Sequence, residues 1–160
     1  MDNCGDNSTF LWITKNNMLI GEYHYNLDTK GRVAMPSKLR GILGDEVIIT
    51  RGLDNCLFIF PKKDWEEIVL KIKNLPLSQA NSRAFARLML AGAMNVNLDT
   101  QGRIIIPDYL RKFANLKKKI VIAGVYNRLE VWDEEIWEEY KRRTEKESGD
   151  IAEKLSDLGI

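Results

Sequence analysis

Hydrophobic residues of this chain occur in short runs, each bounded by Gly, Pro, Asp or Asn. Short apolar runs that contain β-branched and aromatic residues between turn-forming residues are typical of β-strands. Turn signals at Gly31, Gly52 and Gly102 separate neighbouring runs. The pattern therefore predicts eight short strands: 23–27, 32–35, 47–50, 57–60, a strand that ends at Leu98, 104–106, 120–123 and 129–132.

Helical segments are predicted between and after the strands. Pro36 and Pro107 each fit the first turn of a short helix, because proline cannot continue a central strand. Ser78 and Asp133 are expected N-caps, and Gly44 is an expected C-terminal stop. Helices are therefore predicted at residues 37–43, 63–73 and 78–91, and after Pro107 and Asp133.

The chain contains a tandem duplication. Residues 26–40 align with 97–111 without a gap, and after one inserted residue the match resumes between 48–60 and 120–132. Such self-similarity indicates two copies of one structural unit. Nine positions of the first alignment are identical: Asn26/Asn97, Leu27/Leu98, Asp28/Asp99, Thr29/Thr100, Gly31/Gly102, Arg32/Arg103, Pro36/Pro107, Leu39/Leu110 and Arg40/Arg111.

Both copies contain the turn sequence Asp-Thr-x-Gly-Arg. Asp28 and Asp99 suit the first position of a type I turn, because the carboxylate can accept nearby backbone N–H groups. Gly31 and Gly102 suit the left-handed position that follows, where a Cβ would clash. These four residues are therefore predicted to shape the two turns of a pair of β-hairpins.

Turn geometry does not require the arginine that follows, Arg32 or Arg103. Arginine on a rigid strand presents a planar, permanently charged fork to phosphate oxygens or to the O6/N7 edge of guanine. A second interpretation is equally open: each arginine could pair with its own aspartate and brace the turn.

Other residues near the turns are candidates for DNA contact. Lys30 and its counterpart Gln101 can donate hydrogen bonds to DNA, and Lys38 and Arg40 follow without an intervening acid. Spacing also allows Arg40 and its counterpart to be solvated residues that favour a helix C-terminus. The second copy is basic at Arg103, Arg111, Lys112, Lys117, Lys118 and Lys119.

Eight strands in two copies predict a mixed, mainly β fold with peripheral helices. Each copy alone approaches the lower size limit for an independent core, so the copies are expected to share one. We therefore expect a closed or partly closed β-barrel with pseudo-two-fold symmetry and short helices at its ends.

Composition is that of a globular protein, with 160 residues, 44% of them hydrophobic and 29% charged. The net charge of +1 is unevenly distributed. Residues 133–160 hold ten acidic and five basic residues, a net charge of −5, which leaves +6 on residues 1–132. The near-zero net charge of the chain therefore hides an excess of positive charge on residues 1–132. This excess permits DNA binding without establishing it.

Candidate catalytic chemistry is sparse. Cys4, Cys56 and the single histidine His24 form no motif of metal ligation or nucleophilic catalysis, and no phosphate-binding loop is present. We expect no enzyme activity, metal, cofactor or small-molecule substrate.

No apolar run approaches the ~20 residues of a membrane span. Acidic residues precede the apolar patch near the start, so residues 1–17 are expected to form a flexible extension and not a signal peptide.

Ordered motifs run through both halves of the chain. They are Gly21-Glu22-Tyr23, Asp28-Thr29-Lys30-Gly31-Arg32, Pro36-Ser37-Lys38-Leu39-Arg40, Thr50-Arg51-Gly52-Leu53-Asp54-Asn55-Cys56-Leu57, Leu75-Pro76-Leu77, Arg83-Ala84-Phe85, Leu90-Ala91-Gly92-Ala93, Asp99-Thr100-Gln101-Gly102-Arg103 and Asn127-Arg128-Leu129-Glu130-Val131-Trp132. From residue 18 to about 155, this order of motifs resembles the MraZ family. Members of that family usually begin at the residue that matches Met18, so the resemblance assigns residues 1–17 no role.

The resemblance implies two SpoVT/AbrB-like swapped-hairpin units per chain and a ring-shaped homo-oligomer. It implies binding to short direct repeats of double-stranded DNA upstream of the division and cell-wall gene cluster, with regulation of the protein's own gene. It places the DNA-contacting arginine at Arg32, with Arg103 as its counterpart. Because Lys30 is replaced by Gln101 in the second copy, the first turn is predicted to dominate affinity.

The resulting organisation is an extension at 1–17, a first AbrB-like repeat at 18–64, a helical connector at 65–93, a second repeat at 94–137 and an acidic helical tail at 138–160. A cytoplasmic protein at the nucleoid is expected. The competing hypothesis is a ring-forming scaffold for protein interactions. In that case Ile136, Trp137 and Tyr140 of the C-terminal helix would contact partners, and DNA repeats would not be preferred.

Overall fold

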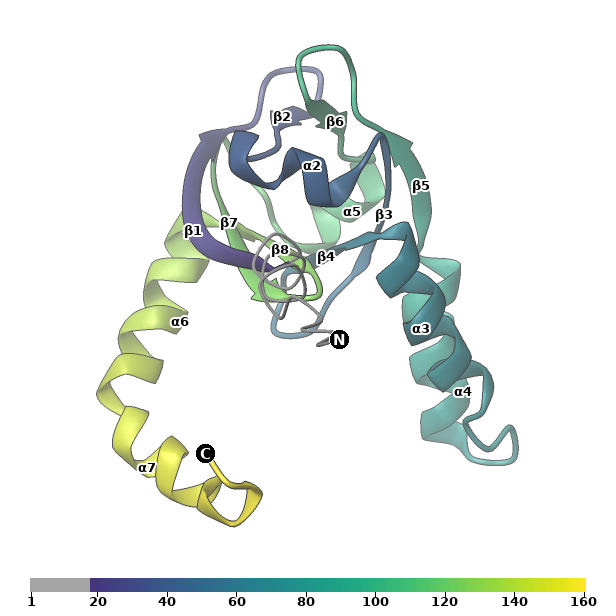
Figure 1. Ribbon diagram of the computed structural model, residues 1–160, viewed down its shortest axis with the longest axis vertical. Coiled ribbons are helices and arrows are strands. Elements are labelled where there is room, and N and C mark those ends of the chain that lie inside the picture. The colour runs from purple at the N-terminus through teal and green to yellow at the C-terminus, as the bar shows by residue number, and fades with distance from the viewer. Residues whose placement is uncertain (1–17) are drawn as a thin grey trace, which may run out of the picture.

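Two β-rich copies share one antiparallel sheet in the computed structural model, which describes residues 18–160 (Figure 1). The predicted extension at 1–17 lies outside the described residues. All eight predicted strands are confirmed. They are β1 (Leu19–Asn26), β2 (Arg32–Ala34), β3 (Glu46–Arg51) and β4 (Leu57–Pro61) in the first copy, and β5 (Met94–Asn97), β6 (Arg103–Ile105), β7 (Lys119–Tyr126) and β8 (Leu129–Asp133) in the second.

The copies exchange their first strands. Strand β1 of the first copy pairs with β7 of the second, and β5 of the second copy pairs with β3 of the first. The six-stranded sheet has the order β1-β7-β8-β4-β3-β5, and β2 pairs separately with β6. The mainly β class with several helices is therefore confirmed.

The sheet is not closed, so the closed form of the predicted barrel is wrong. The end strands β1 and β5 are not neighbours in the sheet order. The three-residue strands β2 and β6 lie between the upper ends of β1 and β5 (Figure 1), and they pair only with each other. The backbone groups of β2 and β6 form hydrogen bonds with each other and not with β1 or β5. Strands β1 and β5 therefore remain the edges of the sheet.

Both copies contribute to the main hydrophobic core, as the size of each copy predicted. Val33 of β2 lies opposite Ile104 of β6, and both side chains are buried. The same cluster contains Leu19, Met35, Val47, Ile49, Leu57, Ile59, Ile106, Leu110, Ile120, Ile122, Leu129 and Val131. Neither copy can therefore unfold without exposing apolar surface of the other.

The helices occupy two positions. The short segments η1 (Ser37–Leu39), α2 (Arg40–Leu43) and α5 (Asp108–Phe113) lie near the β2–β6 pair (Figure 1). Two helical arms extend from the opposite side of the sheet (Figure 1). One arm contains α3 (Lys62–Lys73), α4 (Ala80–Ala86) and η2 (Arg87–Ala91), and the other contains α6 (Glu134–Lys146), α7 (Ser148–Lys154) and η3 (Ser156–Leu158). Across residues 18–160, no helix combines the length and the apolar character needed to cross a membrane.

Two predicted helix caps are not formed. Helix α4 begins at Ala80 with Gln79 at its N-cap position, and the backbone carbonyl of Ser78 instead accepts a hydrogen bond from Nη1 of Arg83 (3.1 Å). Asp133 stands at the N-cap position of α6, but it makes no side-chain capping bond. Its buried carboxylate accepts the backbone N–H of Lys117 (3.1 Å) and so ties the loop before β7 to the end of β8.

A second core cluster attaches α6 to the outer face of the sheet. The Trp132 ring lies 5.4 Å from that of Trp137 and 5.0 Å from that of Tyr140, measured between centroids. Ile136 packs on the same cluster, which also contains Trp65 and the buried free thiol of Cys56. Trp65, Trp132 and Trp137 therefore serve to pack this cluster. The side chains that the scaffold hypothesis assigned to partners, Ile136, Trp137 and Tyr140, are partly buried against this cluster.

Candidate nucleic-acid interface

The two Asp-Thr-x-Gly-Arg turns stand side by side at the end of the molecule opposite the helical arms (Figure 1). They are held together by matching backbone bonds: Met35 N–H donates to the carbonyl of Gly102 (2.9 Å), and Ile106 N–H donates to that of Gly31 (2.8 Å). The two strands that flank each turn therefore pair with strands of the other copy and not with each other. This corrects the prediction that each turn closes a β-hairpin. The turns form one rigid, pseudo-symmetric unit.

Each turn has the geometry predicted from its aspartate and glycine. Oδ1 of Asp28 accepts the backbone N–H groups of Lys30 (2.9 Å) and Arg32 (2.8 Å), and Asp99 accepts two equivalent bonds at 2.9 Å. Gly31 has φ of +78° and Gly102 has φ of +73°, values that favour glycine. The backbone N–H of the arginine is the main reason that each carboxyl has a pKa below its ordinary value.

The arginines combine both interpretations drawn from the sequence. Nε of Arg32 donates to Oδ2 of Asp28 (2.7 Å), and Nε of Arg103 donates to Oδ2 of Asp99 (2.9 Å), so the bracing ion pairs are present. The side chains nevertheless remain 30% and 28% exposed. Within residues 18–160, no hydrogen bond engages the terminal Nη groups of either arginine. The carboxylate thus orients the guanidinium group through Nε, while its two Nη groups remain available as hydrogen-bond donors.

Each turn packs against an arginine from the other copy. A Cβ added at Gly102 would collide with the guanidinium of Arg40, and one added at Gly31 would lie 2.8 Å from Cζ of Arg111. Nε of Arg40 donates to the carbonyl of Met35 (3.0 Å), whereas the buried Nε of Arg111 has no partner in the described part of the chain. Both arginines are partly buried beside the turns, so the prediction of solvated helix ends is wrong.

The exchange also divides a basic cluster that the sequence placed together. Lys30 and Arg32 belong to the first turn, but Arg40 packs on the second turn at Gly102. Lys38 precedes Arg40 in the same short helical segment and is exposed. The second turn, with Gln101 exposed at its tip, is therefore accompanied by Arg40 of the first copy.

Replacing Gly102 by alanine should destabilise the protein by about 1–3 kcal/mol, because an L side chain is strained at this φ and would displace Arg40. The free energy of unfolding from urea titration measures the effect. Gly41→Ala is the matched control, since no atom lies within 4 Å of the added Cβ and its backbone is helical. Equal stabilities of the two variants would contradict the role assigned to Gly102.

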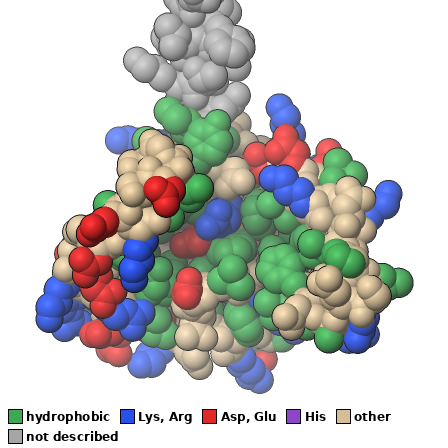
Figure 2. Space-filling model, turned by 90° about the horizontal axis from the view of Figure 1, so that it is seen from below, with side chains coloured by type: hydrophobic (Ala, Val, Ile, Leu, Met, Phe, Trp, Pro, Cys, Tyr) green, Lys and Arg blue, Asp and Glu red, His purple; other side chains and the backbone are tan. Residues whose placement is uncertain are grey.

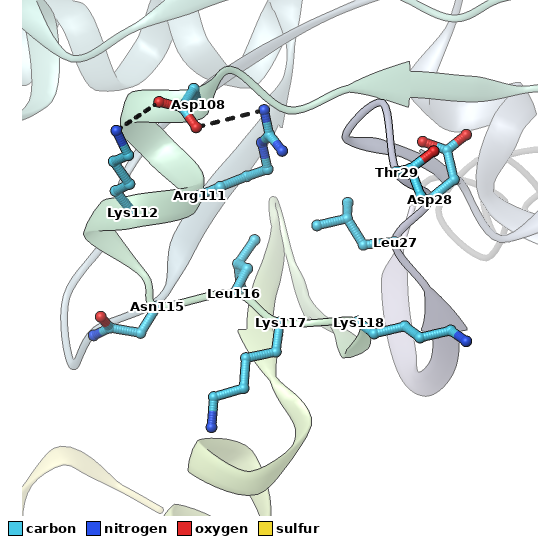
Figure 3. Close-up of a pocket in the computed structure, with 10 residues that line it drawn as sticks. All are labelled: Leu27, Asp28, Thr29, Asp108, Arg111, Lys112, Asn115, Leu116, Lys117 and Lys118. Atoms are coloured by element: carbon cyan, nitrogen blue, oxygen red, sulfur yellow. Dashed lines mark ion pairs between the residues drawn. The ribbon is translucent and has the colours of Figure 1, made fainter.

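An open groove of about 970 Å³ separates the first turn from α5 (Figure 3). Figure 3 shows Arg111 directed toward the first turn, while Lys112, Lys117 and Lys118 project at the periphery. Asp108 pairs with Lys112 (2.9 Å) and Arg111 (3.7 Å). The groove is lined by Leu27, Asp28, Thr29, Asp108, Arg111, Lys112, Asn115, Leu116, Lys117 and Lys118. Sequence reasoning noted these basic residues but missed the groove, because its two walls come from different copies.

Glu22, His24 and Glu138 are the one described group with the composition of a metal site, and their ligand atoms lie within 4.8 Å of one another. Nζ of Lys141, however, lies 3.2 Å from Oε1 of Glu22 and 3.5 Å from Oε1 of Glu138. A divalent cation would have to displace this ammonium group. The group therefore forms an ion-pair network that joins β1 to α6.

His24 makes this network sensitive to pH. Its pKa is raised above 6.5, chiefly by the hydrogen bond between Nδ1 and Glu134 (3.3 Å) and further by Glu22. Since the folded pKa exceeds the unfolded one, the stabilisation is complete below the unfolded value and is lost as pH rises through the folded value. Between about pH 5.5 and 8, the melting temperature should fall more for the natural chain than for His24→Gln. Parallel melting profiles would refute this linkage.

Comparison with known proteins gives similarity over both copies. The family model of the MraZ protein matches residues 18–88 and again residues 89–158. The Transcriptional regulator MraZ of Thermoanaerobacter pseudethanolicus is 47% identical over 143 residues, which cover 89% of this chain and 100% of that protein. The proteins of the same name from Natranaerobius thermophilus and Moorella thermoacetica are 46% and 45% identical, with the same coverage of both chains.

Proposed function

The chain belongs to the MraZ family, and we propose from this membership and from its paired turns that it is a sequence-specific DNA-binding regulator of transcription. The curated relatives carry the name Transcriptional regulator MraZ. The proposed action is binding without catalysis, on double-stranded DNA, in the cytoplasm at the nucleoid.

The observation that carries the proposal is the pair of braced arginines at one end of the molecule. Arg32 and Arg103 follow rigid turns, and each is oriented through Nε by its own aspartate. Pre-oriented guanidinium groups lose little side-chain entropy when they bind phosphate or guanine. Lys30 and Gln101 stand exposed at the turn tips, where they can donate further hydrogen bonds to DNA. Arg40 extends the proposed interface beside the second turn, and the exposed Lys38 is proposed as a further DNA contact.

We assign each copy to an AbrB-like swapped-hairpin unit. The exchange of β1 and β5 between the copies supports this assignment, because each turn then connects strands that pair with the other copy. The two turns together present a double contact to one duplex.

The proposed targets are direct repeats upstream of the division and cell-wall gene cluster, including the protein's own gene, and the proposed assembly is a ring of identical chains. Apolar side chains on both helical arms support self-association, since they are exposed in the single chain: Leu70, Leu77, Phe85, Leu90, Ile151, Leu155, Leu158 and Ile160. Figure 2 shows hydrophobic side chains gathered on the underside, between the arms. A ring would present the turns to consecutive repeats and make later contacts intramolecular.

Titration of duplexes with one repeat, several repeats or a scrambled sequence tests the proposal. The DNA is taken from the region immediately upstream of the protein's own gene. Affinity should rise steeply with the number of repeats, and the logarithm of affinity should fall with that of salt concentration by roughly 0.9 per phosphate contact. Equal affinity for all three duplexes would reject sequence-specific binding and would favour the interaction scaffold.

A further inference from the structure

The backbone register identifies positions that are equivalent in the two copies. The N–H of Leu27 donates to the carbonyl of Lys118 (2.7 Å), and the N–H of Leu98 donates to that of Asp45 (2.8 Å). One residue further along the paired strands, Asn26 lies opposite Lys119 and Asn97 lies opposite Glu46. Lys118 and Lys119 beside the first turn therefore correspond to Asp45 and Glu46 beside the second. This register matches Ile48 with Val121, one residue away from the alignment of 48–60 with 120–132, which is corrected here for strands β3 and β7.

Charge is inverted at these equivalent positions. The side of the first turn carries two lysines where the side of the second carries an aspartate and a glutamate. Lys118, Lys119 and Asp45 are exposed, Glu46 is partly exposed, and none of the four takes part in an ion pair within the described chain. The difference in charge between the two sides is therefore exposed to solvent, and no neighbouring side chain neutralises it.

The other equivalent positions differ in both directions, since Asp108 and Tyr109 of the second copy correspond to Ser37 and Lys38 of the first. Lys112 on the wall of the groove corresponds to Gly41, and Lys30 at the tip of the first turn corresponds to Gln101. The acidic residues that line the groove are already engaged, Asp28 with Arg32 (2.7 Å) and Asp108 with Lys112 (2.9 Å). Figure 3 shows Lys117 and Lys118 extending from the groove's rim into open space. The groove beside the first turn is thus electropositive at Lys118 and Lys119, whose equivalents beside the second turn are acidic.

We propose that this groove, with Lys118 and Lys119 at its rim, binds the phosphodiester backbone of DNA and thereby imposes one orientation of the chain on a duplex. The inference rests on the proposed function and adds a polarity to it. DNA that lies across the two turns continues over the lysines of the first side, whereas Asp45 and Glu46 repel the backbone on the second side.

A fixed orientation of the chain on DNA affects which arrangement of binding sites the protein recognises. A unit with true two-fold symmetry reads palindromic sites and binds them equally in either direction. The turns alone are nearly symmetric, with Arg32 and Arg103 in matching ion pairs. Charge inversion beside them removes this equivalence, so successive copies of the chain meet DNA in the same direction. Such an arrangement selects direct repeats over inverted ones.

The test compares three double variants of the full chain on a duplex array of direct repeats. Lys118→Ala with Lys119→Ala should lower affinity roughly tenfold, uniformly across repeat and scrambled sequences, and reduce the salt slope by about 2. Asp45→Asn with Glu46→Gln should raise affinity. Lys71→Ala with Lys73→Ala removes two exposed lysines from α3 on a helical arm and should change neither quantity.

Hydroxyl-radical footprints supply the orientation. The natural chain should protect backbone to one side of each repeat, and the Lys118/Lys119 variant should lose that flanking protection while it retains the centre. A natural chain that binds with symmetric footprints, or a lysine variant with unchanged slope and footprint, would overturn the polarity while leaving the proposed function intact. Failure of the natural chain to bind repeats at all would overturn both.

Discussion

Alanine in place of Arg32 should weaken binding to direct-repeat DNA by roughly ten- to a hundredfold, the range expected when a specific arginine contact to a base is removed. The loss should exceed that contact alone. Asp28 stays in place through its bonds to backbone N–H groups, so the variant presents an unpaired carboxylate where the natural chain presents an ion pair. Fluorescence anisotropy with a labelled repeat array measures the change.

Arg103→Ala is the matched comparison, because the two arginines differ little in their own turns. Their ion pairs measure 2.7 and 2.9 Å, and their exposures are 30% and 28%. The first turn, however, has Lys30 at its tip and the basic groove beside it, whereas the second has Gln101. We therefore expect Arg103→Ala to reduce affinity by a smaller factor than Arg32→Ala.

Arg32→Lys separates charge from geometry. Lysine keeps the positive charge but lacks the planar fork, so its affinity should fall between those of arginine and alanine. Light scattering and the melting temperature establish that each variant keeps its assembly and fold. If Arg32→Ala bound the array with natural affinity and salt slope, the arginine would be a brace of the turn and not a reader of DNA.

Ile104→Ala should destabilise the whole protein by about 2–5 kcal/mol, the range typical of removing a buried isoleucine side chain to alanine. Ile104 is 1% exposed and lies opposite Val33 where the two copies meet. The cavity would therefore open in a core to which both copies contribute. Chemical denaturation gives the loss in the free energy of unfolding.

The same experiment tests whether the copies fold as one unit. Trp65 packs on Phe60 of the first copy, whereas Trp132 lies in β8 of the second, so variants that retain only one of these tryptophans place a probe on a strand of each copy. Because β1 pairs with β7 and β5 with β3, both probes should show one coincident transition in the natural chain and in Ile104→Ala. Two separate transitions would contradict the shared core.

Ile105→Ala is the control for this substitution. The neighbouring isoleucine is 57% exposed, so the same change in side-chain size should alter the free energy of unfolding by no more than about 0.5 kcal/mol. A similar loss at both positions would show that the β2–β6 strand pair, and not burial, determines the effect.

Local interactions explain why the turns could be predicted. Each aspartate bonds to backbone groups two and four residues later, so all atoms of the turn belong to one short segment. Glycine at the left-handed position is likewise a local requirement. The two candidate DNA-contacting arginines, and the option of ion pairs with Asp28 and Asp99, could therefore be predicted from neighbouring residues alone. The eight strands and their order along the chain follow from local pattern in the same way.

Residue pattern alone thus predicts the strands, the turns, the duplication and, through ordered motifs, the family. The pairing of the strands depends on long-range packing, because two copies of one pattern offer each strand similar partners within and between copies. That choice leaves the sheet open, places Arg40 against Gly102 and brings Lys118 beside Leu27. Asp133 finds its partner Lys117 only through the β7–β8 register. These contacts join residues far apart in the chain, and local pattern holds no information about them.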